Sequence, residues 1–239
     1  MKALEGSVIE WQSAQEGTRT SRRVDAKGTL LPGTNSLTML EFTSEQRVVL
    51  DPCSWETYER ILAEHADRSV PRFTYCDGVL EIMSPSPEHE EMNEGVKQII
   101  WVLCEELDLE VRPLGSTTQR RKTLARGVEP DSSYFFGNTE REPLDCPPDL
   151  MVEVEISRSA LDKIPILAGL GVPELWRCGP EGSQIFHLRG QTYEAAERSA
   201  FVPLTAGDLT HLLARRGQLK QNVWLKELRA WARARQPHS

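Results

Sequence analysis

Three acidic residues and one lysine have the types and the spacing to bind a divalent cation. Asp131 follows Pro130, the pair Glu153 and Glu155 comes after twenty-one intervening residues, and Lys163 follows eight residues later. Carboxylate oxygens are the ligands that Mg²⁺ prefers, and this ion usually keeps several waters. A bound Mg²⁺ would activate a water for attack on a phosphodiester, and the lysine would orient that water or stabilise the charge on phosphorus. Each signal is weak alone, so the prediction depends on their combination.

The two glutamates lie in an apolar segment that predicts a β-strand at residues 149–157. The alternation of apolar residues places one face of this strand in a core and both carboxylates, Glu153 and Glu155, on the other face. A buried carboxylate without a partner costs on the order of several kcal/mol, so the two acids need a cation. The alternative is an exposed edge strand whose glutamates form ordinary salt bridges with Arg158 or Arg177. The flanking apolar residues favour a strand covered on both faces.

The preceding chain predicts elements that could position this strand. Asp77-Gly78 between two apolar runs is the strongest hairpin signal in the chain. Ser86 and Pro87 predict the start of a long helix that ends near Leu107. Asp131 stands at the beginning of an apolar strand at residues 132–136. The other elements expected here are a strand from Val48, a helix opened by Ser54 that ends near His65, and a strand at residues 110–114.

The following chain predicts where the lysine lies. Pro165 is tolerated only in the first turn of a helix, so a helix begins around Asp162 and places Lys163 at its start, near the end of the acidic strand. A positive charge there opposes the helix dipole, which favours a specific partner for this lysine. Gly171 ends the helix. A strand at 174–178, a hairpin of 184–188 and 192–195, and two helices near 204–213 and 223–231 complete the expected elements.

Further charged residues are candidates for accessory roles. His89 and Glu81 are possible accessory members of the acidic site, and several acids near the start of the long helix compete for such a role: Glu88, Glu90, Glu91 and Glu94. Acids at a helix start are also explained by the helix dipole alone. The densest basic cluster contains Arg120, Arg121 and Lys122. Such a run is most often a solvated face, but it is the best candidate for nucleic-acid contact.

Composition limits the classes of function. The chain has 239 residues, and 36 acids against 28 bases give a net charge of -8, the wrong sign for binding nucleic acid through bulk electrostatics. Any such contact must come from a local basic patch. Five scattered cysteines form no Cys-x-x-Cys pair, which indicates reduced thiols and no zinc site. The absence of a long apolar run predicts a soluble, cytoplasmic protein without a membrane partner.

Several motifs together resemble a known family. They are Pro130-Asp131, Asp149-Leu-Met-Val-Glu153-Val, Lys163, Gly171-Val-Pro-Glu-Leu-Trp176, His89, and Asp77-Gly-Val-Leu-Glu-Ile-Met-Ser84-Pro85. This set resembles the Uma-type family of putative restriction endonucleases, within the PD-(D/E)XK nuclease superfamily. The resemblance covers roughly residues 48 to 215. It implies an α/β (α+β) fold with a restriction-endonuclease-like core, in which a mixed β-sheet is flanked by helices.

The resemblance also implies an activity and its residues. It implies a DNA endonuclease that depends on Mg²⁺ or Mn²⁺, with Asp131 as the first metal-binding acid and Glu153 as the second. The superfamily carries a lysine where this chain has Glu155, and Lys163 resembles a migrated lysine. Glu155 either adds a metal ligand or pairs with Lys163. Because cutting a duplex normally needs two active sites, a homodimer is expected. The alternative is a catalytically inactive nuclease-like fold that acts as a nucleic-acid-binding or regulatory module.

The expected organisation has three parts. Residues 1–45 are rich in Gly, Ser, Thr and charge and predict a variable, poorly ordered N-terminal segment. Residues 46–215 form the restriction-endonuclease-like domain that the resemblance implies. Residues 216–239 contain the expected C-terminal helix.

Overall fold

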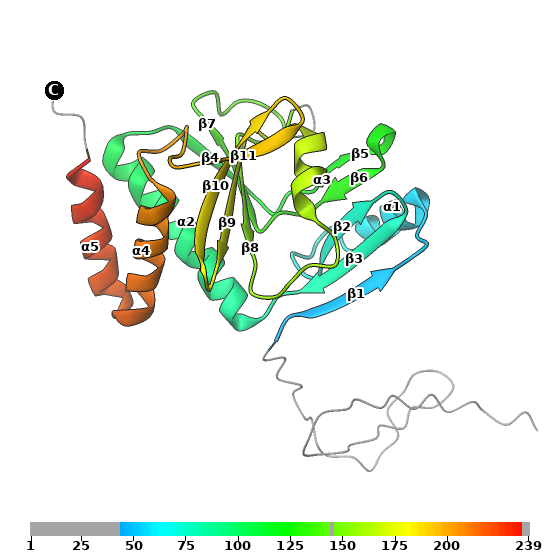
Figure 1. Cartoon of the computed structure of the whole chain (residues 1–239), viewed down its shortest axis with the longest axis horizontal. Helices are drawn as coiled ribbons and strands as arrows, with labels where there is room; N and C mark the ends of the chain where they lie inside the picture. The colour runs from blue at the N-terminus through cyan, green and yellow to red at the C-terminus, as the bar shows by residue number, and fades with distance from the viewer. Residues whose placement is uncertain (1–43, 144–145, 236–239) are drawn as a thin grey trace, which may run out of the picture. The chain divides into compact units, whose positions relative to one another are not determined.

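Two β-sheets and five α-helices form the part of the chain that the computed structural model describes, which is residues 44–143 and 146–235 (Figure 1). These elements lie in one compact unit. Most of the N-terminal segment expected at residues 1–45 lies outside the described residues. The boundary expected after residue 215 falls inside a helix, α4 (Ala206–Gln218).

The smaller sheet is antiparallel and has the strand order β1-β3-β2-β6-β5. Its strands are β1 (Gln46–Leu50), β2 (Arg72–Cys76), β3 (Val79–Ser84), β5 (Gln119–Arg121) and β6 (Arg126–Val128). The two-residue turn between β2 and β3 is the one expected from the sequence. Both of its residues have positive φ, 47° for Asp77 and 92° for Gly78, which is the backbone that this kind of turn requires.

The two faces of the smaller sheet differ in chemistry. One face packs on α1 (Trp55–Glu64) through an aromatic cluster that includes Tyr58 and Tyr75. Thr74 of β2 and Glu81 of β3 are paired across the two strands. Their side chains point away from the aromatic cluster, to the second face of the sheet, because alternate residues of a strand point to opposite faces. Arg72 lies on this second face as well, two residues before Thr74. The second face therefore carries charged side chains that are nevertheless buried.

The larger sheet is mixed, which confirms the expected fold class. Its order is β11-β10-β9-β8-β7-β4, and only the β8–β9 pair is parallel among its described strands. The strands are β4 (Val111–Gly115), β7 (Ser132–Phe136), β8 (Leu150–Val154), β9 (Glu174–Gly179), β10 (Gly182–Arg189) and β11 (Thr192–Ala196). The sequence predicted the mixed sheet but not the second, antiparallel sheet beside it.

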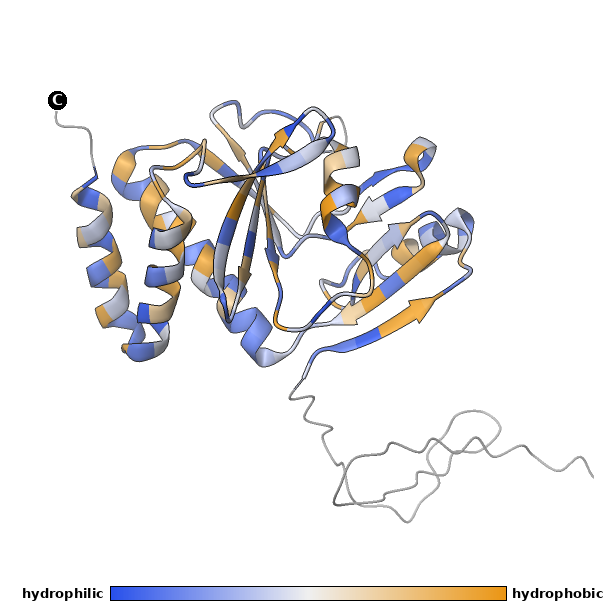
Figure 2. Ribbon diagram, viewed as in Figure 1, coloured by the Kyte–Doolittle hydropathy of each residue, from blue (hydrophilic) through white to orange (hydrophobic). Residues whose placement is uncertain are grey.

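Helices cover both faces of the larger sheet. On one face, α2 (Pro87–Leu107) packs with α4 and α5 (Gln221–Arg233) in the largest hydrophobic cluster. The ribbons of α4 and α5 alternate between hydrophobic and hydrophilic residues, as expected for amphipathic helices (Figure 2). On the other face, α3 (Lys163–Leu170) packs against Met151 and Leu175. No helix in the described part of the chain is long and apolar enough to cross a membrane.

Helix ends follow the predicted signals closely. Ser54 caps α1 and Ser86 caps α2, with Pro87 as the first residue of α2. Asp162 caps α3, and Gly171 ends it with φ 83°. These local signals confirm the predicted starts of all three helices and place Lys163 in the first turn of α3.

Candidate functional site

Strand β8 carries Glu153 into the interior between the sheet and α3. All five residues of β8 are buried, and Leu150, Val152 and Val154 belong to the cluster on the α2 side. Met151 and Glu153 have the opposite side-chain direction and face the α3 layer. Glu153 is only 3% exposed. The prediction of a strand covered on both faces is confirmed, although β8 ends at Val154 and not at residue 157.

The second glutamate of the predicted pair lies in a different environment. Glu155 follows the end of β8, and its carboxylate accepts hydrogen bonds from Arg177 at 3.0 Å (Nε) and 2.7 Å (Nη2). Both side chains of this ion pair are about one-third exposed. The alternative of a surface salt bridge with Arg177 therefore describes Glu155, whereas it is wrong for the buried Glu153.

Asp131 lies beside Glu153 at the start of β7, and its side chain is fully buried. Its Oδ2 accepts a hydrogen bond from the backbone N–H of Val154 at 2.7 Å. Its Oδ1 lies 2.9 Å from both Arg72 Nε and His89 Nε2. These two contacts are ion-pair distances whose alignment is poor for hydrogen bonds. Asp131 is therefore an anion held by one backbone donor and two side-chain cations.

Lys163 completes the central cluster from the first turn of α3. Its Nζ lies 2.5 Å from Glu153 Oε2, and its side chain is 12% exposed. The helix dipole disfavours a cation at this position, and the carboxylate of Glu153 offsets that cost. The structure thus brings together Asp131, Glu153 and Lys163, which lie on separate segments of the chain.

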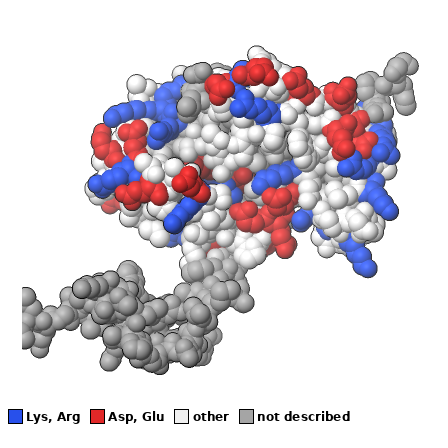
Figure 3. Space-filling view, turned by 180° about the vertical axis from the view of Figure 1, so that it is seen from behind, with Lys and Arg blue, Asp and Glu red and all other residues white. Residues whose placement is uncertain are grey.

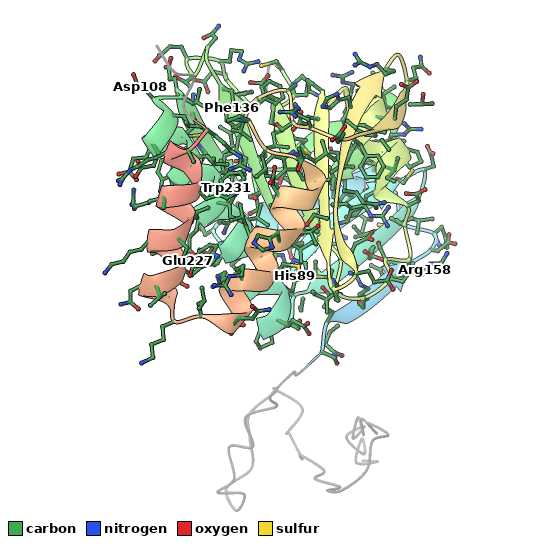
Figure 4. All side chains as sticks on the ribbon, turned by 60° about the vertical axis from the view of Figure 1, so that its left-hand side comes forward. His89, Asp108, Phe136, Arg158, Glu227 and Trp231 are labelled. Atoms are coloured by element: carbon green, nitrogen blue, oxygen red, sulfur yellow. The ribbon has the colours of Figure 1, made fainter. Side chains whose placement is uncertain are left out.

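His89 connects this cluster to a residue that the sequence did not single out. His89 lies fully buried near the start of α2 (Figure 4), with Nδ1 2.5 Å from Glu45 Oε1. Its other ring nitrogen faces Asp131, so the imidazole bridges two carboxylates. Glu45 directly precedes β1 and carried no sequence signal that linked it to the site. Arg72 was also missed, although its place on the face of the predicted hairpin opposite the aromatic residues was available from the alternation of residues.

The acids proposed as accessory members lie in different places. Glu81 is buried on β3 and binds Arg47 Nη1 at 2.7 Å. Among the acids of α2, Glu90 reaches the site indirectly, because its carboxylate lies 3.0 Å from Arg72 Nη2. Glu94 pairs with Lys97 on the outside of α2. Glu88 and Glu91 are exposed.

The contacts among Glu45, His89 and Asp131 determine which of these three side chains are charged. Burial alone would raise the pKa of Asp131, but its contact with His89 and the charge of Lys163 lower the pKa to about 2. Burial alone would lower the pKa of His89, but its contacts with Asp131 and Glu45 raise the pKa to about 9. Burial also acts to raise the pKa of Glu45, yet the bonds from His89 and Ser157 lower it to about 2. At neutral pH Glu45 and Asp131 are therefore anions, and His89 between them is a cation.

The pair of Glu153 and Lys163 differs from these three residues in its ionisation. Burial and the neighbouring charge of Asp131 raise the pKa of Glu153 to about 7, against the opposite effect of Lys163. Burial alone would lower the pKa of Lys163, but the charges of Glu153 and Asp131 raise it. Lys163 therefore stays charged, and Glu153 is the carboxyl of this site that titrates nearest to neutral pH.

The residues present fit a divalent cation only with additional oxygen ligands. Glu153 Oε1 is buried and has no hydrogen-bond partner among the described residues, so it is available to a cation. Nevertheless, the described residues contain no group of three or more His, Cys, Asp or Glu side chains placed to hold a metal ion. Mg²⁺ can be bound by one or two carboxylates together with waters and substrate phosphates. Asp131 and Glu153 would be the two protein ligands in such a site.

A cavity of about 700 Å³ opens beside the cluster. Arg72 and Asp131 lie on its wall, together with Glu90 and Lys97 from α2 and Ser116 from the segment after β4. Arg72 is thus the cation of the cluster that lies closest to this opening. Asp131 contributes to the wall of this cavity, although its side chain has no exposed surface.

The basic cluster lies apart from these contacts, at the edge of the smaller sheet. Arg120 and Arg121 belong to β5, and Lys122 begins the short 3₁₀ helix η1 (Lys122–Leu124). Arg120 lies 4.0 Å from Glu59, and Lys122 lies 3.3 Å from Glu56. Both glutamates belong to α1, so part of the positive charge of the cluster is already paired.

Comparison with known proteins identifies the family. Residues 55–214 match the family model Uma2, described as "Putative restriction endonuclease". No curated protein matches the chain. A solved structure described as a putative nuclease from Anabaena variabilis is 20% identical, with 64% of this chain and 98% of that chain covered and a TM-score of 0.45. Because the family model matches more than half of the chain, the protein belongs to the Uma2 family of putative restriction endonucleases.

Proposed function

We propose that this protein is a metal-dependent endonuclease that hydrolyses phosphodiester bonds in DNA. The observation that supports this proposal most is the meeting of Asp131, Glu153 and Lys163 in one buried cluster. Two carboxylates can hold a divalent metal that assists phosphodiester hydrolysis, and an ammonium group beside them can stabilise the developing negative charge. Membership of a family of putative restriction endonucleases supports the same class of reaction.

Each residue has a role that follows from its contacts. Asp131 stays ionised because Val154 N–H and the neighbouring cations stabilise its charge, so it is available as a metal ligand at neutral pH. Glu153 presents the unpaired Oε1 as the second ligand. A divalent metal bound there would lower the pKa of a coordinated water and neutralise charge on the reacting phosphate.

The two cations Lys163 and Arg72 have roles in binding the substrate and in stabilising its charge. Lys163 fixes Glu153 Oε2 through a 2.5 Å contact and leaves Oε1 free. Its charge also stabilises the negative charge that develops when water attacks phosphorus. Arg72 lies on the wall of the cavity, where its guanidinium can bind a phosphate oxygen of the entering strand. Glu155 is the remaining residue of the sequence-based site, and its contact with Arg177 leaves its role as a ligand a prediction.

A catalytically inactive module is the second candidate. It is favoured by the contacts of the acids themselves, since Lys163 already occupies Glu153 Oε2 and two cations face Asp131 Oδ1. A divalent ion must add its charge to these three cations, which weakens its binding. A nucleic-acid-binding protein with this fold would keep Arg72 and the cavity without needing the metal.

Plasmid nicking with matched variants tests the proposal. We expect purified protein to nick supercoiled DNA with Mg²⁺ or Mn²⁺, and we expect Glu153→Gln and Lys163→Met to reduce the rate by at least about 100-fold. Calorimetric titration of Mn²⁺ should show binding to wild type and none to Glu153→Gln.

The control is Asp149→Asn, which disrupts the ion pair with Arg141 at the other end of β8 and should nick DNA normally. Metal binding without nicking in wild type would support the inactive module. Nicking that persists in Glu153→Gln would exclude this site as the source of activity. The expected homodimer is tested in parallel, because a dimer should linearise plasmid DNA and a monomer should accumulate nicked circles.

A further inference from the structure

Residues 155–162 form an irregular strap that connects the end of β8 to the start of α3. Lys163 is the first helical residue after this strap, so the course of the strap decides where its side chain begins. The strap has little support of its own. Ile156 and Leu161 are half-buried against the two neighbouring hydrophobic clusters, whereas Ser157, Arg158, Ala160 and Asp162 are exposed. Figure 4 shows Arg158 at the outer edge of that view.

Glu81 of the smaller sheet holds the middle of the strap. Its Oε2 accepts a hydrogen bond from the backbone N–H of Ala160 at 2.6 Å, and its Oε1 accepts one from Ser159 Oγ at 2.8 Å. The side chain of Glu81 is 1% exposed. A hydrogen bond that a backbone N–H donates to a buried carboxylate fixes the main chain itself, because it does not depend on a flexible side chain of the strap.

Arg47 supplies the positive charge that the buried carboxylate of Glu81 needs. Its Nη1 lies 2.7 Å from Glu81 Oε1, so the buried carboxylate has a cationic partner. The same guanidinium reaches the strap, with Nε 3.3 Å from Ser157 Oγ. Glu45 adds a second attachment by accepting a hydrogen bond from the backbone N–H of Ser157 at 3.2 Å. The strap is thus attached to the smaller sheet at two points, three residues apart.

We infer that Glu81 is a positioning residue for Lys163. By fixing Ser159 and Ala160, it sets the entry of the chain into α3 and so keeps Lys163 Nζ against Glu153. A lysine at a helix start depends for its position on the connection that precedes the helix. The catalytic consequence rests on the proposed nuclease function, but the placement of Lys163 does not.

Chemical labelling of Lys163 tests the placement without any need for activity. The protein is treated with an amine-acetylating reagent, and the modification rate of Lys163 is followed by mass spectrometry with the exposed Lys226 as internal reference. We expect Glu81→Gln to speed the labelling of Lys163 by roughly tenfold, which is the effect of losing one hydrogen bond to a charged acceptor. Ser159→Ala, which removes only one strap donor, should give a smaller increase in the same direction.

Glu174→Gln is the matched control. Glu174 is also 1% exposed and also holds a loop backbone, because it accepts a hydrogen bond from Ala200 N–H at 2.7 Å. That loop does not lead to Lys163, so this variant should label Lys163 at the wild-type rate. Equal labelling of Lys163 in wild type, Glu81→Gln and Ser159→Ala would overturn the inference, and so would an equal increase in Glu174→Gln.

A double-mutant cycle then tests the catalytic consequence. We expect Glu81→Gln to lower kcat for nicking with little change in KM, and to cause no further loss when Lys163→Met is already present. Additive losses would mean that Glu81 acts independently of Lys163 and would overturn the positioning role. If wild type does not nick DNA, the proposed function fails, and the labelling rates alone decide whether Glu81 positions Lys163.

Discussion

At the scale of single residues, the site is a chain of alternating charges drawn from distant parts of the sequence. Glu45, His89, Asp131, Arg72 and Glu90 contact one another in that order, at separations between 2.5 and 3.0 Å. Removing one partner from a buried ion pair typically costs about 3–5 kcal/mol, because the other charge stays buried without a partner. The three inner members, His89, Asp131 and Arg72, therefore each depend on two neighbours, and this arrangement keeps Asp131 ionised.

The pKa of His89 gives a prediction for stability. Because the pKa of His89 rises from 6.5 to about 9 on folding, its charge stabilises the folded protein fully below pH 6.5. This contribution is lost as pH rises through about 9. The limiting slope is 1.36 kcal/mol per pH unit, and because His89 is not fully protonated in the folded protein near pH 8.5, we expect the free energy of unfolding of wild type to fall by about 1.2 kcal/mol between pH 7.5 and 8.5. Urea unfolding at the two pH values measures this fall.

The chosen interval separates His89 from other titrating groups. Glu153, whose pKa is raised to about 7, has made most of its contribution below it, and the buried thiols, whose ordinary pKa is 9.0, make only a minor one within it. His89→Gln should be less stable than wild type at pH 7.5 and should lose most of the fall. His211→Gln changes an exposed histidine on α4 and should keep it. A fall of the same size in His89→Gln would show that His89 is not the group responsible.

At the scale of elements, local signals predicted most helices and strands. Ser86 and Pro87 fixed the start of α2, and Asp77-Gly78 fixed the first hairpin, because caps and tight turns depend on neighbouring residues alone. The same reasoning located α3 and therefore Lys163. These predictions also placed Asp131 at the start of a strand and Glu153 within one.

What the sequence did not reveal depends on distant pairing. Arg72 and Glu45 reach the site only because the smaller sheet lies beside the start of α2, and no local pattern encodes that arrangement. The environment of Glu155 was missed for another reason. Alternation predicts the face of a side chain but not its burial: β8 ends at Val154, and Arg177 of the neighbouring strand binds the partly exposed carboxylate of Glu155.

The packing of α1 on the smaller sheet gives an element-scale prediction. A Cβ at Gly127 of β6 would overlap the hydroxyl and ring of Tyr58, which is fully buried and stacked on Tyr75. We expect Gly127→Ala to lower the free energy of unfolding by about 1–3 kcal/mol, because the ring cannot move without disturbing its cluster. Gly217→Ala is the control, since a Cβ there meets nothing within 4 Å inside α4 and should stabilise the protein by about 0.5–1 kcal/mol. Thermal or urea unfolding of the two variants should therefore show shifts of opposite sign, and a neutral Gly127→Ala would refute the close packing.

At the scale of the whole molecule, the net charge of -8 opposes binding to DNA. Acidic and basic side chains are interspersed on the face that Figure 3 shows, without one continuous basic surface. Any attraction for phosphates must therefore come from limited groups such as Arg120, Arg121 and Lys122. The partial pairing of this cluster with Glu56 and Glu59 means that DNA would compete with the glutamates of α1 for the same cations.

Charge reversal tests whether this basic cluster contacts DNA. Each phosphate contact to duplex DNA contributes about 0.9 to the slope of log affinity against log salt concentration. We expect replacement of Arg120, Arg121 and Lys122 by glutamate to weaken binding and to reduce that slope by about 1 to 3, depending on how many of the three side chains touch phosphates. Fluorescence anisotropy with a labelled duplex, at salt concentrations between 50 and 200 mM, measures both quantities.

An equal change of net charge elsewhere provides the control for this experiment. Lys220, Lys226 and Arg229 lie at the start of α5 and along it, and Arg229 is paired with Glu105 much as Lys122 is paired with Glu56. Reversing these three residues adds the same negative charge to the molecule, so it reproduces the long-range repulsion without touching β5 or η1. If both triple variants lose affinity equally and keep the wild-type slope, only net charge is at work and the cluster makes no direct contact. A reduced slope in the β5 and η1 variant alone would place DNA against the edge of the smaller sheet, whose β2 strand also carries Arg72 to the cavity beside Asp131.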